Sequence, residues 1–263
     1  MPIRLKSTLR EQLAAADRCL IGGWVCSGSS VMAEIMAGSG LDVLLIDMEH
    51  APHSLESVLA QLQAAAGYDI TSMVRVPAAD PVIVKQVLDL GAQNILVPMV
   101  STAHQAREVA RQAQYPPAGI RGVGNALARS GRWNRVERYL QDGADHVCVH
   151  VQIESVEGVE NAEEIAAVDG IDGVFVGPSD LAASMGLLGQ QTHPDVIAAV
   201  HRVFTGAQRA GTPAGVNAFD PGIAEQYRAG GASWVLVGAD VDLVARGSEN
   251  LAAAFIPTGT QSQ

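Results

Sequence analysis

Four charged side chains stand at or just beyond the ends of short apolar segments of this 263-residue chain: Asp47, Arg75, Glu154 and Asp180. A buried strand rarely carries a charge unless that charge is paired or binds a ligand. Four segments that each deliver a charge to one rim of a fold therefore indicate a functional site more strongly than any single residue does.

Glu154 and Asp180 are candidate ligands of a divalent cation. Two carboxylates without histidine or cysteine partners suit a hard cation such as Mg²⁺ or Mn²⁺, which keeps water or substrate oxygens at its other positions. The alternative is a structural ion pair with Arg75, and the spacing is compatible with both interpretations.

His50 and Arg75 are candidates for the chemical step. An unperturbed imidazole has a pKa near about 6.5, which suits His50 to proton transfer at neutral pH. The alternative is a core histidine that hydrogen-bonds a backbone carbonyl. The guanidinium of Arg75 can form a forked contact with a carboxylate or with a developing enolate. Its alternative role is to hold Asp47 or Glu154 in an ion pair.

The lysines exclude one kind of chemistry. The chain has only Lys6, near its N-terminus, and Lys85, inside a helix-like stretch. A Schiff-base enzyme needs a desolvated lysine in its pocket, and neither position suits that role. We therefore expect no imine intermediate.

The composition excludes several other classes of protein. The chain has 17 basic and 28 acidic residues, a formal charge of −11, which argues against a general nucleic-acid binder. Its 48% hydrophobic and 17% charged residues exclude a disordered chain. No apolar run reaches the roughly 18 residues of a membrane span. The three cysteines form no CxxC motif and are typical of reduced thiols in a cytoplasmic protein.

Short apolar segments alternate with helix-patterned segments along the chain. The expected strands are 19–26, 42–49, 71–77, 94–100, 146–154, 173–178, 213–218 and 234–240. Eight such units predict an α/β fold, a single (β/α)₈ (TIM) barrel, because a barrel of about 250 residues would use nearly the whole chain. The competing fold is a doubly wound open sheet, which usually has fewer strands at this length.

The segment 146–154 predicts which side chains face the barrel interior. One of its faces is entirely aliphatic and should meet the helices: Val147, Val149, Val151 and Ile153. Since side chains alternate along a strand, Gln152 and Glu154 should then point inward, and His146 and His150 should fill the barrel. His53, by contrast, is expected in a surface loop.

Local signals mark the helix starts and one long loop. Ser54, Asp80 and Asp220 are expected N-caps, and proline follows the last two. The stretch 115–133 is rich in glycine, proline and arginine, and a long structured loop in a compact domain is often functional. It lacks the third glycine of GxGxxG and follows no strand, so it does not indicate a dinucleotide site.

Several segments of the chain resemble one family. They are LLIDMEHAPHSLESVLAQLQA, VRVP, KQVLDLGAQNILVPMV, YPPAGIRGVG, QIES and GIDGVFVGPSDLAASMG. From about Cys19 to about Ile256, in consistent order, they are similar to the HpcH/HpaI aldolases. This family of class II, metal-dependent pyruvate aldolases includes 4-hydroxy-2-oxoheptane-1,7-dioate and 2-keto-3-deoxy-sugar-acid aldolases.

The resemblance implies a fold, an assembly and an activity. It implies one barrel domain over 1–263, with an N-terminal extension or helix in 1–17 and a flexible tail in 257–263. The family is often hexameric, with C-terminal helices exchanged between subunits. The implied reaction is reversible cleavage of a 4-hydroxy-2-oxo acid to pyruvate and an aldehyde, in aromatic-compound or sugar-acid catabolism. It requires Mg²⁺, Mn²⁺ or Co²⁺ and no organic cofactor.

The resemblance also implies catalytic roles. His50 in DMEH would be the catalytic base, with Asp47 beside it. Arg75 in VRVP would stabilise the enolate and the 2-oxo group. Asp89 in VLDLG would reach a histidine of a neighbouring subunit and raise its basicity.

Binding roles follow from the same motifs. Glu154 and Asp180 would be the metal ligands, and Gln152 would contact substrate. The backbone of Ser179 and Asp180 would receive the pyruvate carboxylate, and Trp24 would form a wall of the pocket.

Departures from the family pattern concern the substrate. The heptanedioate enzyme usually has glycine at the position of Met48, alanine at that of Ser179, and larger apolar residues where this chain has Val216 and Asn217. Val216 and Asn217 would contact substrate. Asn217 makes the aldehyde side more polar, so a hydroxylated aldehyde is at least as well supported a product.

Two alternative functions stay open. One is a related lyase that acts on an acyl-CoA ester, although the chain is short and acidic for a site that binds the CoA phosphates. The other is a non-catalytic barrel that binds a small oxo acid as a sensor or scaffold. The second would yield no pyruvate from a 4-hydroxy-2-oxo acid.

Overall fold

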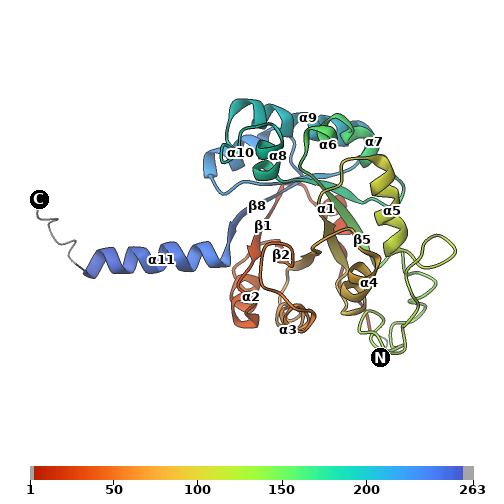
Figure 1. The fold of residues 1–263 in the computed structure, drawn as a ribbon. Coiled ribbons are helices and arrows are strands. Elements are labelled where there is room, and N and C mark those ends of the chain that lie inside the picture. The colour runs from red at the N-terminus through yellow and green to blue at the C-terminus, as the bar shows by residue number, and fades with distance from the viewer. Residues whose placement is uncertain (1–2, 257–263) are drawn as a thin grey trace, which may run out of the picture.

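The structure, a computed structural model, describes residues 3–256 and forms a closed barrel of parallel strands in the order β1 to β8 (Figure 1). The strands are β1 (Leu20–Val25), β2 (Val43–Asp47), β3 (Thr71–Arg75), β4 (Asn94–Val97), β5 (Cys148–Ile153), β6 (Gly173–Val176), β7 (Ala214–Asn217) and β8 (Trp234–Ala239). Each lies inside one of the eight expected segments, which confirms the (β/α)₈ barrel.

Helices surround the sheet, and three of them begin at the N-caps that the sequence predicts. They are α1 (Leu9–Ala15), α2 (Ser30–Ala37), α3 (Leu55–Ala65), α4 (Pro81–Asp89), α5 (Ala103–Ala113), α6 (Val156–Glu160), α7 (Ala162–Ala166), α8 (Pro178–Ser184), α9 (Pro194–Ala210), α10 (Pro221–Ala229) and α11 (Asp240–Phe255). Ser54, Asp80 and Asp220 accept hydrogen bonds from the first-turn N–H groups of α3, α4 and α10, as expected of N-caps.

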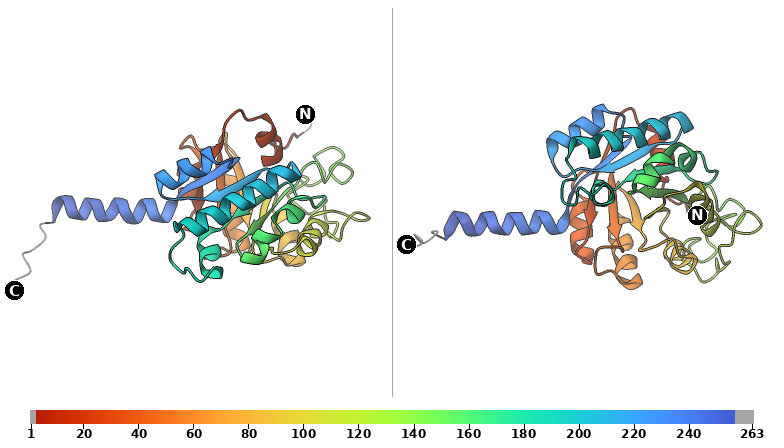
Figure 2. Two further views of the ribbon diagram at one scale, coloured as in Figure 1. Left: turned by 90° about the horizontal axis from the view of Figure 1, so that it is seen from above. Right: turned by 45° about the horizontal axis from the view of Figure 1, so that its top comes forward.

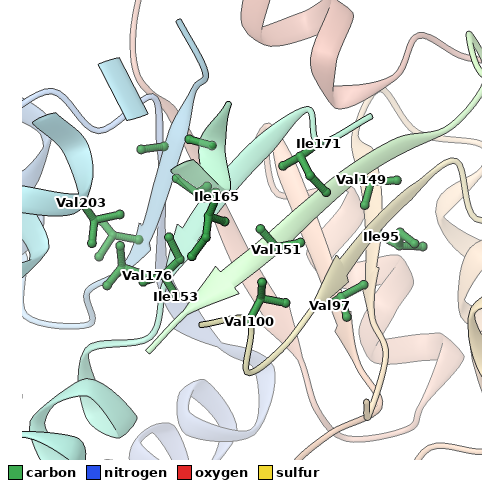
Figure 3. Packing of buried hydrophobic residues seen from close by; sticks show 14 of the residues in the cluster. Ile95, Val97, Val100, Val149, Val151, Ile153, Ile165, Ile171, Val176 and Val203 are labelled. Carbon is green, nitrogen blue, oxygen red and sulfur yellow. The ribbon is translucent and has the colours of Figure 1, made fainter. Parts of the chain in front are cut away.

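Two apolar layers hold the barrel together. Val149, Val151 and Ile153 of β5 pack outward against the helices with aliphatic side chains of the neighbouring strands (Figure 3). The barrel interior is filled by a separate cluster that includes Cys148 and Trp234. The predicted alternation along β5 is therefore confirmed. The three cysteines, all among the described residues, are free.

Helix α1 lies at the N-terminal end of the barrel and falls within the segment 1–17, where we expect an extension or helix. Leu9 is fully buried, and its N–H donates to Asn94 Oδ1 over 2.7 Å. Asn94 in turn donates to the Ser72 carbonyl oxygen. The helix is thus joined directly to the first residues of β3 and β4. The predicted tail 257–263 lies outside the described residues.

His150 lies fully buried in the barrel interior, as predicted, with its ring 5.6 Å from that of Trp234. Neither ring nitrogen has a hydrogen-bond partner among the described residues. Burial lowers the pKa of His150 to about 3, because a charged ring would be desolvated without compensation. His146, by contrast, does not fill the barrel; it stacks on Tyr139, outside the strand.

We expect His150→Leu to reduce the acid sensitivity of the protein. In the unfolded chain this imidazole becomes protonated below a pH of about 6.5, whereas in the folded chain it stays neutral down to about pH 3. The unfolded state binds more protons in this window, so stability falls as pH falls. The wild type should lose about 2 kcal/mol more than the variant between pH 7 and pH 5 in urea unfolding. Exposed His104→Leu is the control; equal pH slopes in all three proteins would contradict the assignment.

A long irregular segment, 114–147, joins α5 to β5 and contains the arginine-rich stretch singled out from the sequence. The Arg121 side chain is completely buried, with its guanidinium carbon 4.6 Å from the centre of the Tyr115 ring. Its Nη2 donates to Asp89 Oδ1 over 3.0 Å. The loop is thus tied to the last residue of α4.

Helix α11 projects away from the barrel in all three views (Figures 1 and 2). Its start is anchored because buried Asp240 accepts hydrogen bonds from the backbone N–H groups of Cys26 and Ser27. Beyond this point apolar side chains face solvent, including Leu243, Leu251 and Phe255, which is 82% exposed. Within residues 3–256, no helix is both long and apolar enough to cross a membrane.

Candidate active site

The C-terminal ends of the strands gather most of the residues that the sequence singles out. Asp47 is the last residue of β2 and pairs in register with Arg75, the last residue of β3. Glu154 directly follows β5, and Asp180 lies in the first turn of α8 after β6. Parallel strands end at the same rim of a barrel, so these side chains share one site.

Arg75 is held by two carboxylates. Its Nε and Nη2 each donate to one oxygen of Asp47 over 2.8 Å, and its Nη1 lies 2.9 Å from Glu49 Oε2. The Arg75 side chain is only 7% exposed. Burial opposes the charge and is the largest single influence, but the hydrogen bond and charge of Asp47, together with the charges of Glu49 and Glu154, raise the pKa of Arg75. The guanidinium is therefore permanently charged and fixed in orientation by Asp47, and three of its five N–H groups make no hydrogen bond with Asp47.

The Trp24 ring lies against this arginine. The Arg75 guanidinium carbon lies 4.4 Å from the centre of the Trp24 ring. The indole N–H of Trp24 donates to Asn217 Oδ1 over 2.8 Å. Asn217 is thereby oriented toward the barrel mouth, whereas Val216 packs in the outer layer against the helices. The prediction that Val216 contacts substrate is wrong, because alternate residues of β7 face opposite sides.

Glu154 is a buried carboxyl group with unusual acidity. Its Oε1 accepts a hydrogen bond from the Met99 backbone N–H over 2.8 Å, and its Oε2 accepts one from Gln152 Nε2. Burial raises the pKa of Glu154 to about 7, and the negative charges of Glu49 and Asp180 add to this rise. Burial also raises the pKa of Glu49. The site therefore favours an additional positive charge.

These residues fit a divalent cation. Asp47, Glu49, Glu154 and Asp180 outnumber the single guanidinium of Arg75, and the Gln152 Oε1 atom is buried without a partner among the described residues. Within residues 3–256 no three Asp, Glu, His or Cys side chains are grouped as a complete metal site. A site with two protein carboxylates, in which water and substrate oxygens occupy the other coordination positions, needs no third protein ligand.

Both histidines after β2 lie where the sequence allows, His50 exposed at the rim and His53 in a loop. The His50 side chain is 65% exposed, with Nε2 3.9 Å from Glu49 Oε2, so it is not a core histidine. His53 lies in a loop, as expected, but its Nδ1 contacts the Asp47 carbonyl oxygen and its Nε2 is buried. His53 therefore supports the backbone that carries Asp47.

A side cavity of about 320 Å³ adjoins the rim. Ser179 and Asn217 line it together with Gln191, Thr192 and Asp220. Within residues 3–256, its lining contains several polar side chains and no lysine or arginine. This surface suits neutral hydroxyl groups better than a carboxylate.

Asp89 is not at this rim. It ends α4 near the opposite end of the barrel and pairs with buried Arg121, so it is not a simply solvated helix residue. Glu49 and Met99 also contact site residues, although neither was singled out from the sequence. Glu49 could have been found, because it lies two residues after Asp47 in the DMEH motif. No residue pattern predicts the φ of 59° at Met99, whose N–H donates to Glu154.

Comparisons with known proteins agree with this geometry. The family model for HpcH/HpaI aldolase/citrate lyase matches residues 20–247. A 4-hydroxy-2-oxo-heptane-1,7-dioate aldolase of Escherichia coli is 49% identical over 240 residues, which cover 91% of this chain and 92% of that protein.

Two solved structures are similar over nearly their whole length. An HpcH/HpaI aldolase/citrate lyase family protein from Burkholderia cenocepacia J2315 has a TM-score of 0.88 and 40% identity, covering 92% of this chain and 96% of that one. An HpcH/HpaI aldolase from Desulfitobacterium hafniense DCB-2 has a TM-score of 0.84 and 30% identity, covering 94% and 98%. The chain belongs to the HpcH/HpaI aldolase/citrate lyase family.

Proposed function

We propose that the protein is a lyase, a divalent-metal-dependent aldolase that reversibly cleaves a 4-hydroxy-2-oxo acid to pyruvate and an aldehyde. The observation that carries this proposal is the Arg75 guanidinium, fixed by Asp47 and Glu49 at a rim that also holds Glu154 and Asp180. An enolate forms when the C3–C4 bond of such a substrate breaks, and an oriented cation stabilises it.

Glu154 and Asp180 would hold the cation, which would act as a Lewis acid toward the oxo acid. We expect Mg²⁺, Mn²⁺ or Co²⁺ because the protein ligands are carboxylate oxygens. The N–H groups of Arg75 that are not bonded to Asp47 would donate to the developing negative charge, and the Trp24 ring packs against the guanidinium. The N–H groups at the start of α8, at Ser179 and Asp180, are suited to a carboxylate.

His50 is the proposed base. Its imidazole is accessible and adjoins Glu49, so it can take the 4-hydroxyl proton, directly or through one water, and return it in the reverse reaction. Gln152 keeps one amide oxygen free at the floor of the site and is the proposed substrate contact.

The side cavity favours a hydroxylated aldehyde product. Its polar lining includes Asn217 and Asp220 and, among the residues that the structure describes, no cationic side chain. A terminal carboxylate, as in 4-hydroxy-2-oxoheptanedioate, would meet the negative charge of Asp220. A 2-keto-3-deoxy sugar acid would instead present hydroxyl groups that these side chains can bind.

Pyruvate release across a substrate panel tests the proposal. Protein with Mn²⁺ is mixed with 4-hydroxy-2-oxo acids of differing tails, and pyruvate is followed through lactate dehydrogenase. We expect cleavage, with higher kcat/KM for hydroxylated than for carboxylated tails. Absence of pyruvate from every member would favour a non-catalytic oxo-acid-binding barrel, and turnover of malyl-CoA alone would favour the acyl-CoA lyase.

The proposed assembly is a hexamer with α11 exchanged between subunits. The exposed apolar side chains of this projecting helix support the proposal, because a monomer would leave them in water. Asp89, remote from its own rim, would then serve His50 of a neighbouring subunit. A fully active monomer in light scattering would contradict both parts.

Asp89→Asn should have two separable effects. Loss of the carboxylate leaves buried Arg121 unpaired and should destabilise the fold by about 3 kcal/mol. A carboxylate near a histidine favours the protonated ring, so its removal should also move the acid limb of the pH–rate profile to lower pH.

Arg121→Met is the matched control because it breaks the same ion pair but keeps the negative charge of Asp89. It should be destabilised without any shift of the acid limb to lower pH. If the pH–rate profiles of Asp89→Asn and wild type were superimposable, Asp89 would have no role in catalysis and would serve only its ion pair with Arg121.

A further inference from the structure

A second concave site lies at the opposite end of the barrel from the catalytic rim. A cavity of about 230 Å³ is enclosed by residues 4–7, by the end of α3, by the first residues of β3 and β4, and by the loop that carries Arg129 and Arg132. Arg4 and Lys6 contribute two further positive charges, and no aspartate or glutamate of the described chain lines the cavity. A wholly basic pocket is unexpected in a chain with a formal charge of −11.

The cations of this pocket have no carboxylate partners among residues 3–256. Arg129 Nη1 donates to the Leu90 carbonyl oxygen over 2.9 Å, Arg132 Nη1 donates to the Arg129 carbonyl oxygen, and Lys6 donates to that of Tyr68. A carbonyl satisfies one donor but does not neutralise the charge. Each guanidinium has five N–H donors, so most of them remain available.

The two guanidinium groups are held close together. Their Nη1 atoms lie 2.8 and 3.0 Å from the position that a Cβ on Gly91 would occupy, and Gly91 has a φ of +94° that favours glycine. Burial lowers the pKa of Arg129, and the charge of Arg132 lowers it further; burial also lowers the pKa of Arg132. An anion placed between them would relieve this repulsion. The buried hydroxyl of Thr71 in the cavity wall is likewise unpartnered among the described residues.

We propose that this pocket binds a small doubly charged oxyanion, a phosphate or a dicarboxylate, between Arg129 and Arg132. Planar guanidinium groups match such oxygens with paired, charge-assisted hydrogen bonds. Lys6 and Arg4 close the pocket from the N-terminal segment. The site is distinct from the catalytic rim of the same barrel because it lies where the strands begin rather than where they end.

Calorimetric titration of metal-free protein at low ionic strength tests the proposal, with inorganic phosphate and succinate as separate probes. The R129Q/R132Q variant removes both guanidinium groups. A66E keeps them but places a carboxylate at the exposed end of α3 beside the cavity. The matched control is R107Q, which removes an exposed arginine of α5 outside the pocket. Circular dichroism checks the fold of each protein.

We expect wild type and R107Q to bind at least one probe, and R129Q/R132Q and A66E to bind it at least about tenfold more weakly. The better probe identifies phosphate or dicarboxylate as the ligand. Bound probe should also protect Arg129 and Arg132, but not Arg107, from phenylglyoxal modification read by mass spectrometry.

Equal binding by all four proteins would place the anion elsewhere and overturn the proposal. The proposal would also be overturned if wild type bound neither probe. If, in addition, R129Q/R132Q changed only the oligomeric state, the two arginines would serve a subunit contact instead. If R129Q/R132Q fails to fold, A66E and the protection pattern decide the question.

Discussion

Arg75→Ala should lower kcat by at least about 10²- to 10³-fold, the loss typical of removing one preorganised donor to a developing negative charge. The guanidinium is already oriented by Asp47 and Glu49 before substrate arrives, so its interaction with the enolate strengthens only as charge develops. Metal affinity should change much less, because the proposed ligands are Glu154 and Asp180. Steady-state kinetics and Mn²⁺ titration measure the two quantities.

Arg75→Lys separates charge from geometry. Lysine keeps the positive charge but cannot donate to both oxygens of Asp47, so it should restore little activity. Loss of the guanidinium also leaves Asp47 buried without its partner, so unfolding free energies must accompany the kinetics. If Arg75→Ala folds and turns over substrate at nearly the wild-type rate, Arg75 does not stabilise the enolate and serves only as an ion-pair partner of Asp47.

Removal of divalent metal should abolish activity, and Mg²⁺, Mn²⁺ or Co²⁺ should restore it after treatment with EDTA. Glu154→Gln, which keeps the shape of the side chain but loses its charge, should bind Mn²⁺ far more weakly and lose most of its activity even at saturating metal. Borohydride added with pyruvate should leave the protein unmodified, whereas an adduct on Lys85 would contradict the metal-dependent mechanism.

The pH dependence of metal binding provides a sharper test. Because the pKa of Glu154 is raised to about 7 in the metal-free protein, the carboxyl group must lose a proton before it can bind a cation below that pH. The apparent Kd for Mn²⁺ should therefore be about tenfold weaker at pH 6 than at pH 8. Glu154→Gln should lack this dependence. A wild-type affinity that does not vary between these pH values would contradict the assignment of Glu154 as a ligand.

The barrel could be predicted because its signals are local and repeated. Aliphatic residues on alternate positions of β5 identified the face toward the helices, and the same alternation placed Gln152 and Glu154 inside. Ser54, Asp80 and Asp220 marked helix starts because the side chain that caps a helix lies within three residues of the N–H it accepts.

The site was less predictable because its contacts join residues distant in sequence. The pairing of Asp47 with Arg75 was one open alternative, but the part played by Glu49 requires knowing how the chain turns after β2. The partnership of Asp89 with Arg121 depends on the course of an irregular loop, which no periodic pattern describes. Val216 was misassigned because a motif gives the position of a residue along the strand but not the side of the sheet on which its side chain lies. Neighbouring residues of a strand point to opposite sides, and Val216 points toward the helices.

Closure of the barrel has a consequence for how the chain is made. One edge of strand β1 stays unpaired until β8 is added, where Leu20 lies opposite Trp234. This ladder joins the first strand of the sheet to the last one. During synthesis from the N-terminus, β1 and each newly formed strand present open edges that can pair with other chains. Contacts of such long sequence separation also form slowly. A chain that ended before β8 would keep both edges, so the barrel is most vulnerable to aggregation just before its synthesis is finished.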